Sequence, residues 1–177
     1  KTGSDDYASN SSTVGKVEID ENDAYVSGNI ESGDDKDWIR VDLAKDITYK
    51  IEMRGVDTSD GTLADPYING LYDSTGNLIS ETTDDDGGTG ANAHLEYTPI
   101  NTGSFYIEAS SYFNDETGTY RVAVSKVINE DDYKADKSTE GVIEVDSSMS
   151  GSIESAGDID WFKLQLVKGT TYEINLE

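Results

Sequence analysis

Carboxylates gather immediately before a tryptophan at two places in this sequence. Residues 28–43 read GNIESGDDKDWIRVDL, and residues 151–166 read GSIESAGDIDWFKLQL. Carboxylates held close together repel one another, so one of them binds a proton, the loops move apart, or a cation lies among them. Calcium suits such a site because it takes six to eight oxygen ligands from flexible loops. The alternative is an acidic rim that is merely solvated.

Other segments between the expected strands are also acidic. Neither the twelve-residue EF-hand pattern nor a GGxGxD nonapeptide array is present, so a calcium site would have to be assembled from separate loops. The remaining candidate ligands are Asp57, Asp60 and Asp65, then Asp84, Asp85 and Asp86, and finally Asp115 and Glu116.

Catalytic chemistry finds little support in these residue types. His94 is the only histidine and there is no cysteine, which excludes thiol catalysis and a usual zinc site. No GxSxG nucleophile elbow occurs. A carboxylate pair can hydrolyse glycosides, but a small β-sandwich offers no obvious deep cleft. We therefore expect a protein that is not an enzyme.

The charge of the chain restricts its partners. Among 177 residues, 37 are acidic and 13 are basic, which gives a net charge of −24. Phosphate groups would be repelled, so neither nucleic acid nor an anionic membrane surface is expected as a partner. High salt or divalent cations would screen or neutralise such a surface. The lack of cysteine is common in exported bacterial proteins, in which calcium can replace the disulfide as a stabilising link.

The sequence also repeats itself over a distance much longer than a solenoid repeat. Asp5-Asp6-Tyr7 returns as Asp131-Asp132-Tyr133, and IRVDLAKDITYKIEM returns as FKLQLVKGTTYEINL. We therefore expect one complete domain over residues 1–127 and a partial second copy of it over residues 128–177.

Alternating apolar and polar residues, bounded by turn residues, predict short β-strands throughout. No window shows a helical period, so the expected fold is all-β, an antiparallel β-sandwich of the jelly-roll type. Trp38, at the start of a strand, is expected to fill the end of the core rather than to stack on a sugar. The expected strands are 16–19, 25–30, 38–43, 48–53, 67–72, 77–80, 94–98, 104–110 and 119–125, followed by 141–145, 149–153, 161–166 and 171–176.

Strand direction then predicts where the acidic loops lie. Successive antiparallel strands run in opposite directions, so alternate connections lie at the same end of the sandwich. The segment that holds Asp5 and Asp6 is expected at that end too. Tyr112 and Phe113 lie in one of these loops and are candidate ligand contacts, with packing at the rim as the alternative. The loops expected at this end are 31–37, 55–66, 83–93 and 111–118.

Four stretches of the first copy together resemble the bacterial pre-peptidase C-terminal domain. They are DDYASN, GNIESGDDKDWIRVDLAKDITYKIEM, GVDTSDGTLADPYINGLYDSTGNLI and GSFYIEASSYFNDETGTYRVAV. The resemblance implies a small jelly-roll sandwich that bacteria secrete to the extracellular space, attached to proteases, collagenases or large calcium-rich surface proteins. Members are usually non-catalytic; some bind a substrate such as collagen, and some bind calcium.

Carried over by position, the resemblance implies a set of calcium ligands in the first copy. The second copy keeps only part of this set, because Gly157 replaces Asp34 while Asp158 and Asp160 match Asp35 and Asp37. An equivalent second site is therefore not expected. The implied ligands lie among Asp5, Asp6, Asp34, Asp35 and Asp37, and the runner-up site comprises Asp57, Asp60, Asp65, Asp84, Asp85 and Asp86.

Taken together, the sequence favours a non-catalytic, calcium-binding extracellular module that targets an extracellular protein or a polysaccharide. The alternative is a structural spacer in a multidomain surface adhesin or secreted protease, in which calcium makes the junction between repeats rigid. The apolar faces and open strand edges of the partial second copy also predict self-association through that copy.

Overall fold

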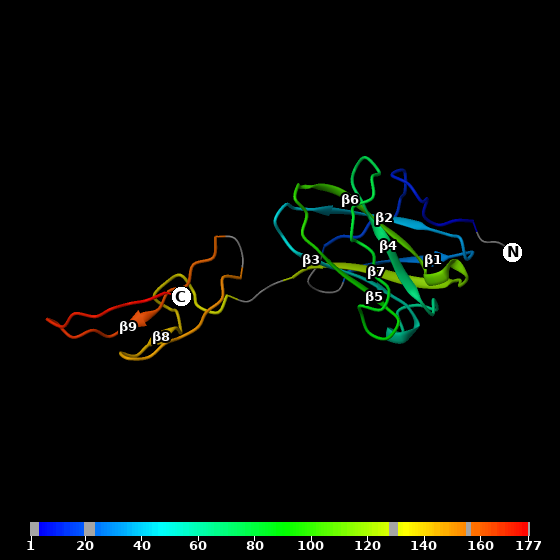
Figure 1. Cartoon of the computed structure of the whole chain (residues 1–177). Helices are drawn as coiled ribbons and strands as arrows, with labels where there is room; N and C mark the ends of the chain where they lie inside the picture. Colours follow the sequence, from blue (N-terminus) through cyan, green and yellow to red (C-terminus); the bar gives the residue numbers. More distant parts are fainter. Residues whose placement is uncertain (1–3, 20–23, 128–130, 155–156, 177) are drawn as a thin grey trace. The chain divides into compact units, whose positions relative to one another are not determined.

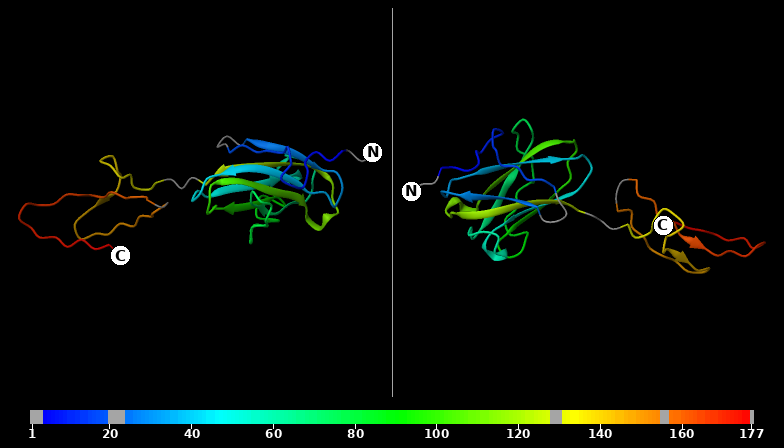
Figure 2. Two further views of the ribbon diagram at one scale, coloured as in Figure 1. Left: turned by 90° about the horizontal axis from the view of Figure 1, so that it is seen from above. Right: turned by 180° about the vertical axis from the view of Figure 1, so that it is seen from behind.

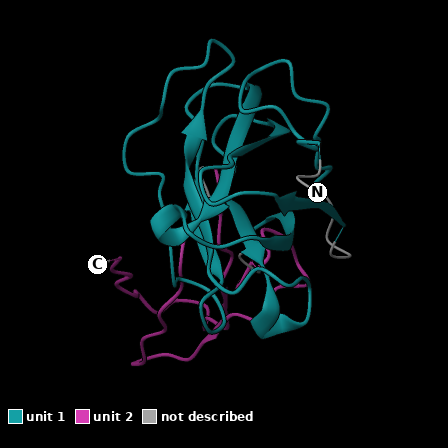
Figure 3. Ribbon diagram, turned by 90° about the vertical axis from the view of Figure 1, so that its right-hand side faces the viewer, with its two compact units in different colours: residues 1–127 teal, residues 128–177 magenta. Residues whose placement is uncertain are grey.

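The computed structural model describes residues 4–19, 24–127, 131–154 and 157–176. The chain divides into two compact units, residues 1–127 and residues 128–177, which Figure 3 colours separately. Unit 1 contains the strands β1 (Tyr25–Ile30), β2 (Asp37–Leu43), β3 (Tyr49–Arg54), β4 (Pro66–Tyr72), β5 (Ala93–Tyr97), β6 (Gly103–Ser111) and β7 (Gly118–Lys126), and the short 3-10 helices η1 (Val56–Thr58) and η2 (Tyr112–Asn114) (Figure 1).

Unit 1 is an antiparallel β-sandwich, which confirms the expected fold class. One sheet has the strand order β1-β7-β3-β5, and the other has the order β2-β6-β4. Figure 2 shows the strands of unit 1 from two further sides. Alternate side chains of each strand point between the sheets. Ile39 and Val41 of β2 and Ile51 and Met53 of β3 are completely buried there. Their removal from water is the main source of stability of such a core.

The strands expected at residues 16–19 and 77–80 are wrong, because these segments pair with neighbouring strands only through isolated single-residue bridges. Residues 16–19 form isolated bridges to β2 and β7, and residues 77–80 form one to β4. Beside residues 77–80, the Leu71 N–H of β4 donates to the Thr82 side-chain hydroxyl at 2.9 Å and not to a backbone carbonyl. Such side-chain acceptors compete with a regular ladder.

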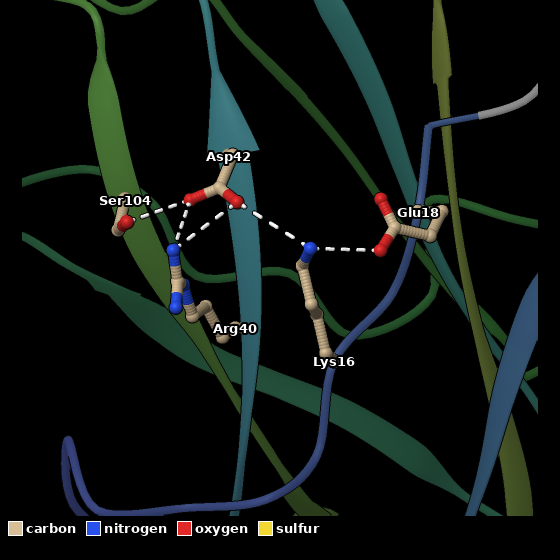
Figure 4. Close-up of polar contacts among 5 residues, drawn as sticks. All are labelled: Lys16, Glu18, Arg40, Asp42 and Ser104. Atoms are coloured by element: carbon tan, nitrogen blue, oxygen red, sulfur yellow. Dashed lines mark hydrogen bonds and ion pairs between the residues drawn. The ribbon is translucent and has the colours of Figure 1, made fainter.

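The segment before β1 is nevertheless held against β2. The Arg40 N–H donates to the Gly15 carbonyl at 2.9 Å, and the Val17 N–H donates to the Arg40 carbonyl at 3.0 Å. Val17 is buried in the core. These contacts fix the path of the chain that leads back to Asp5 and Asp6. A network of exposed polar side chains accompanies them, comprising Lys16, Glu18, Arg40, Asp42 and Ser104 (Figure 4).

Trp38 differs from the expectation. It is buried, but it lies on the outer face of the β2-β6-β4 sheet, because Ile39 and not Trp38 has the parity that points into the core. Its ring packs on Tyr72 and Tyr106, with centroids 4.3 and 5.3 Å away. Its Nε1 donates to Glu108 Oε2 at 2.9 Å. The tryptophan therefore anchors an outer aromatic layer and does not fill the end of the core.

The acidic loops do lie at one end of unit 1, as strand direction predicts. Gly118 pairs with Ile30, Asp37 with Ala109, Met53 with Ala93 and Pro66 with Ser111. These pairs bring the ends of all the loops in question to the same side of the sandwich.

Unit 2 has far less regular structure than its sequence predicts. Its described residues contain only β8 (Val142–Ile143) and β9 (Lys163–Leu164), which pair in parallel. By the repeat, β9 matches β2 and residues 171–176 match β3. In unit 1, β2 pairs with β6 and β3 pairs with β7, and the described part of unit 2 supplies no such partners. Trp161, Leu166 and Ile174 are consequently exposed. Throughout the described residues, no helix has the length and apolar character needed to cross a membrane.

Candidate functional site

Asp37 is the centre of the candidate site. It is the first residue of β2 and shares the inward parity of Ile39, so its carboxylate lies at the end of the core with 0% exposure. The Tyr120 hydroxyl donates to Asp37 Oδ2 at 2.6 Å. The other oxygen, Oδ1, is buried and has no hydrogen-bond partner among the described residues.

Burial sets the protonation of this pair. It raises the pKa of Asp37 to about 8; the hydrogen bond from Tyr120 opposes the rise, and the charges of Asp6, Asp35 and Glu31 add to it. Burial also raises the pKa of Tyr120 well above its usual range, so the hydroxyl keeps its proton and donates. A carboxylate in such surroundings is stable in its charged form only when a cation compensates it.

The segment with Asp5 and Asp6 reaches this site because of Tyr7. The Tyr7 hydroxyl donates to the Ser27 carbonyl at 2.9 Å, and its ring packs against the core. One carboxylate oxygen each from Asp5, Asp6 and Asp37 lie within 4.8 Å of one another. Burial raises the pKa of Asp6, a hydrogen bond with the Asn29 backbone opposes this, and the charges of Asp35 and Asp5 raise it further.

The loop between β1 and β2 adds two more carboxylates. The N–H groups of Glu31 and Lys36 donate to the two oxygens of Asp35, both at 2.9 Å, which closes the loop into a compact turn. Asp5, Glu31 and Asp35 form a second group of oxygens within 4.8 Å. Asp5 belongs to both groups, so five carboxylates form one cluster, which we call the unit 1 cluster: Asp5, Asp6, Glu31, Asp35 and Asp37.

The unit 1 cluster contains four of the five ligands expected from the sequence. Asp34 is exposed and belongs to none of the groups of converging carboxylates among the described residues. Glu31 takes its place, although it lies outside the set of ligands implied by the sequence. Its position immediately after β1, at the end where Asp37 begins β2, is the signal that could have identified it.

The runner-up site separates into two kinds of residue. Three of its aspartates bind the protein itself. Asp57 accepts from the Ala91 N–H at 2.7 Å, and Asp84 accepts from the His94 N–H at 2.6 Å. Asp60 forms ion pairs with Arg54 and Arg121. The other three, Asp65, Asp85 and Asp86, have oxygens within 4.8 Å of one another.

The two candidate ligand contacts lie beside that second acidic group. Tyr112 and Phe113 belong to η2, and Phe113 is 77% exposed. The Tyr112 ring packs on both Phe113 and Tyr67. The Tyr112 N–H donates to the Asp65 carbonyl at 3.1 Å. The aromatic and acidic groups are therefore parts of one surface.

Unit 2 repeats several hydrogen bonds of the unit 1 cluster, although no described residue of unit 2 donates to Asp160 as Tyr120 does to Asp37. The Glu154 N–H donates to Asp158 Oδ2 at 3.0 Å, as Glu31 does to Asp35. The Tyr133 hydroxyl donates to the Ser150 carbonyl at 3.3 Å, as Tyr7 does to Ser27. Four carboxylates with oxygens within 4.8 Å result, and we call them the unit 2 cluster: Asp131, Asp132, Glu154 and Asp160.

Comparisons with known proteins found similarity to solved structures only. No protein-family model and no curated protein sequence matches the chain. Among solved structures, the pre-peptidase C-terminal domain of collagenase from Bacillus anthracis is 14% identical with a TM-score of 0.46, covering 62% of this chain and 92% of that one. PliG, a periplasmic inhibitor of g-type lysozyme, is 12% identical in its Aeromonas hydrophila form, with a TM-score of 0.41 and coverage of 62% and 96%.

The Salmonella Typhimurium form of PliG is 18% identical, with a TM-score of 0.36 and coverage of 62% and 98%. At these identities and scores, we draw neither family membership nor function from the likeness.

Proposed function

We propose that the protein is a non-catalytic extracellular module in which calcium binds to the unit 1 cluster. The observation that carries the proposal is the buried Asp37 carboxylate, which lies in a group of converging carboxylates with Asp5 and Asp6 and whose Oδ1 has no hydrogen-bond partner among the described residues. The ligand atoms are carboxylate oxygens from two separated parts of the sequence, residues 5–6 and residues 31–37. That ligand chemistry fits calcium, a hard cation with flexible coordination.

Calcium would supply the positive charge that this end of the sandwich lacks. It would join the segment before β1 to the loop between β1 and β2 and to the first residue of β2. Calcium would therefore raise the free energy of unfolding, because it binds the folded state and the unfolded chain does not hold the ligands together.

Calorimetric titration with calcium tests the proposal. The wild-type protein is expected to bind with heat and to melt at a higher temperature. Asp37→Asn should weaken binding in unit 1 at least tenfold, since it removes the central charge but keeps an oxygen that can accept from Tyr120.

The matched control is Asp34→Asn, which removes the same charge from the same loop at an exposed position outside the cluster. It should leave affinity nearly unchanged. Equal effects of the two substitutions, or a wild-type protein that shows neither heat nor a thermal shift, would contradict the calcium site.

The unit 2 cluster is a second candidate calcium site. The reason to doubt it was the replacement of Asp34 by Gly157, and Asp34 lies outside the unit 1 cluster. The repeated hydrogen bonds of Asp158 and Tyr133 favour the same chemistry. We therefore expect two bound calcium ions, with one lost in Asp37→Asn and the other lost in Asp160→Asn. A wild-type stoichiometry of one would restrict binding to a single unit.

The role that we favour for the module is targeting of an extracellular biopolymer. Phe113 is exposed, and its ring packs on Tyr112, which in turn packs on Tyr67. A spacer needs no such surface. The two roles differ in one measurement: a spacer shows a calcium-dependent melting temperature without affinity for any polymer.

A further inference from the structure

We propose that Tyr67, Tyr112 and Phe113, together with the carboxylates around them, dock a polypeptide that presents arginine or lysine side chains. We call the three rings the aromatic corner. The proposal rests on the targeting role given above and states the chemistry of its partner.

The aromatic corner is a supported surface and not a single loose side chain. The Tyr67 and Tyr112 rings meet edge to face with centroids 5.4 Å apart, and the Tyr112 and Phe113 rings are 4.2 Å apart. Tyr67 belongs to β4, so the cluster is anchored to a sheet. Phe113, at 77% exposure, offers its ring to a partner. Rigid aromatic anchors of this kind dominate protein interfaces.

The backbone holds Phe113 in its exposed position. Phe113 has φ 56° and ψ −3°, and Asn114 has φ 54°. Residues other than glycine rarely adopt a positive φ. Such a conformation persists where neighbouring structure enforces it. The loop between β1 and β2 packs closely against this turn, since a Cβ added to Gly33 would lie 2.2 Å from the Asn114 carbonyl oxygen. The same loop carries Glu31 and Asp35 of the unit 1 cluster.

Five carboxylates lie at the same end of the sandwich as the aromatic corner, and the backbone carbonyl of one of them, Asp65, accepts from the Tyr112 N–H. Asp65, Asp85 and Asp86 have oxygens within 4.8 Å of one another, and Asp115 and Glu116 directly follow η2. Burial raises the pKa of Asp65, and the charges of the other four raise it further. None of the five forms an ion pair with a lysine or arginine in the part of the chain that is described. The surface is therefore negative without internal compensation.

Rings beside unpaired carboxylates match the guanidinium group better than other ligands. A guanidinium stacks on an aromatic face and pairs with a carboxylate through two parallel hydrogen bonds. The chain contains one such arrangement already: Arg121 Cζ lies 4.0 Å from the centre of the Tyr25 ring while Nη1 pairs with Asp60. An anionic polymer would be repelled, and a neutral polysaccharide would leave the carboxylates uncompensated.

Fluorescence anisotropy with a labelled peptide of six Arg-Gly repeats tests the proposal, in the presence of calcium and on the full chain. Phe113→Ala changes no charge, and it should weaken binding about two- to fivefold, the range of one exposed cation–π contact. The matched control is Ile100→Ala, which removes an equally exposed apolar side chain (77%) in the connection between β5 and β6, at the opposite end of the sandwich. It should leave affinity unchanged.

The carboxylates are tested with Asp85→Asn combined with Asp86→Asn. This variant should weaken peptide binding about two- to tenfold and reduce its salt dependence. Glu96→Gln combined with Asp46→Asn removes the same charge from exposed positions elsewhere and should have a much smaller effect.

Three results would overturn the proposal. The peptide could bind equally to the wild type, Phe113→Ala and Ile100→Ala, which would mean attraction by diffuse charge. A neutral polysaccharide could bind through Phe113 without dependence on salt or on Asp85 and Asp86. Calorimetry could show that the Asp85 and Asp86 substitutions remove a calcium ion and leave peptide binding intact. Calcium titration of Phe113→Ala, expected to match the wild type, separates failure here from failure of the unit 1 cluster.

Discussion

At the scale of single residues, the environment of a carboxylate decides what it can do. Asp34 and Asp37 are three positions apart in one loop, yet Asp34 is exposed and Asp37 is completely buried beside Tyr120. An exposed carboxylate keeps its charge through solvation and needs no partner. The buried one requires either a proton or a cation, and this difference separates a metal ligand from an ordinary surface charge.

The raised pKa of Asp37 predicts a pH dependence of stability without calcium. The pKa is about 8 in the folded protein against 3.8 for the unperturbed group. The folded state then binds more protons between these values, so the contribution of Asp37 to stability is fully present below pH 3.8 and is lost as the pH rises through about 8. Melting temperatures should fall over this range in the wild type relative to Asp37→Asn.

Saturating calcium should displace the proton from Asp37. The melting temperatures of the wild type and of Asp37→Asn should then change with pH in the same way. Asp34→Asn, as control, should follow the wild type. Parallel pH profiles of the wild type and Asp37→Asn in chelator would show that Asp37 does not carry the effect.

At the scale of elements, the site depends on how closely β1 approaches β7. Gly28 of β1 pairs with Tyr120 of β7, and the Tyr120 side chain passes directly over Gly28 toward Asp37. Only the absence of a side chain at Gly28 makes room for this hydroxyl. The element that supplies the ligand loop thus also leaves space for the residue that orients the central carboxylate.

Gly28→Ala is expected to disturb both stability and calcium affinity. A Cβ at this position would lie 2.2 Å from the Tyr120 hydroxyl, so Tyr120 must move and its bond to Asp37 is lost. Overpacking of this kind costs about 1–3 kcal/mol of unfolding free energy. Chemical denaturation measures the loss.

Gly103→Ala is the matched control, because a Cβ there meets no atom within 4 Å. It should change the unfolding free energy by no more than about 0.5 kcal/mol. Similar losses in the two variants would mean that the contact between Gly28 and Tyr120 has no special importance.

At the scale of the whole molecule, the two units differ in how completely they bury their apolar residues. Ile39, Val41 and Leu43 are buried in unit 1, whereas Leu164 and Leu166, which the repeat aligns with Val41 and Leu43, are exposed in unit 2. Exposed apolar faces next to unpaired strand edges invite association. The sequence prediction of self-association through unit 2 therefore stays a proposal with a defined surface.

Light scattering of the full chain should detect dimers through this surface. Association should increase with salt or calcium, which screen the net charge of −24. Leu166→Lys combined with Ile174→Lys should give a monomer, and Val14→Lys, at an exposed position of unit 1, should not. A wild type that stays monomeric at every salt and protein concentration would contradict the proposal.

The alternation of side chains and the direction of the strands were predictable from the sequence, since both follow from the period of two along an extended chain. They predicted the sandwich, the buried faces of β2 and β3, and the gathering of the acidic loops at one end. Alternation also places Asp37 with Ile39 on the inner face and Trp38 with Arg40 on the outer face. It did not reveal that Trp38 is nevertheless buried, because burial on the outer face depends on Tyr72 and Tyr106.

Which carboxylates meet was decided only by the tertiary structure. Glu31 joins the unit 1 cluster and Asp34 does not, because a loop side chain takes its direction from hydrogen bonds within the loop and from segments far away in the sequence, such as Asp5 and Tyr120. Asp57, Asp60 and Asp84 have the same chemistry but bind Ala91, Arg121 and His94. Spacing along the chain determines which end a carboxylate occupies; the partners supplied by other elements determine whether it remains available for a cation.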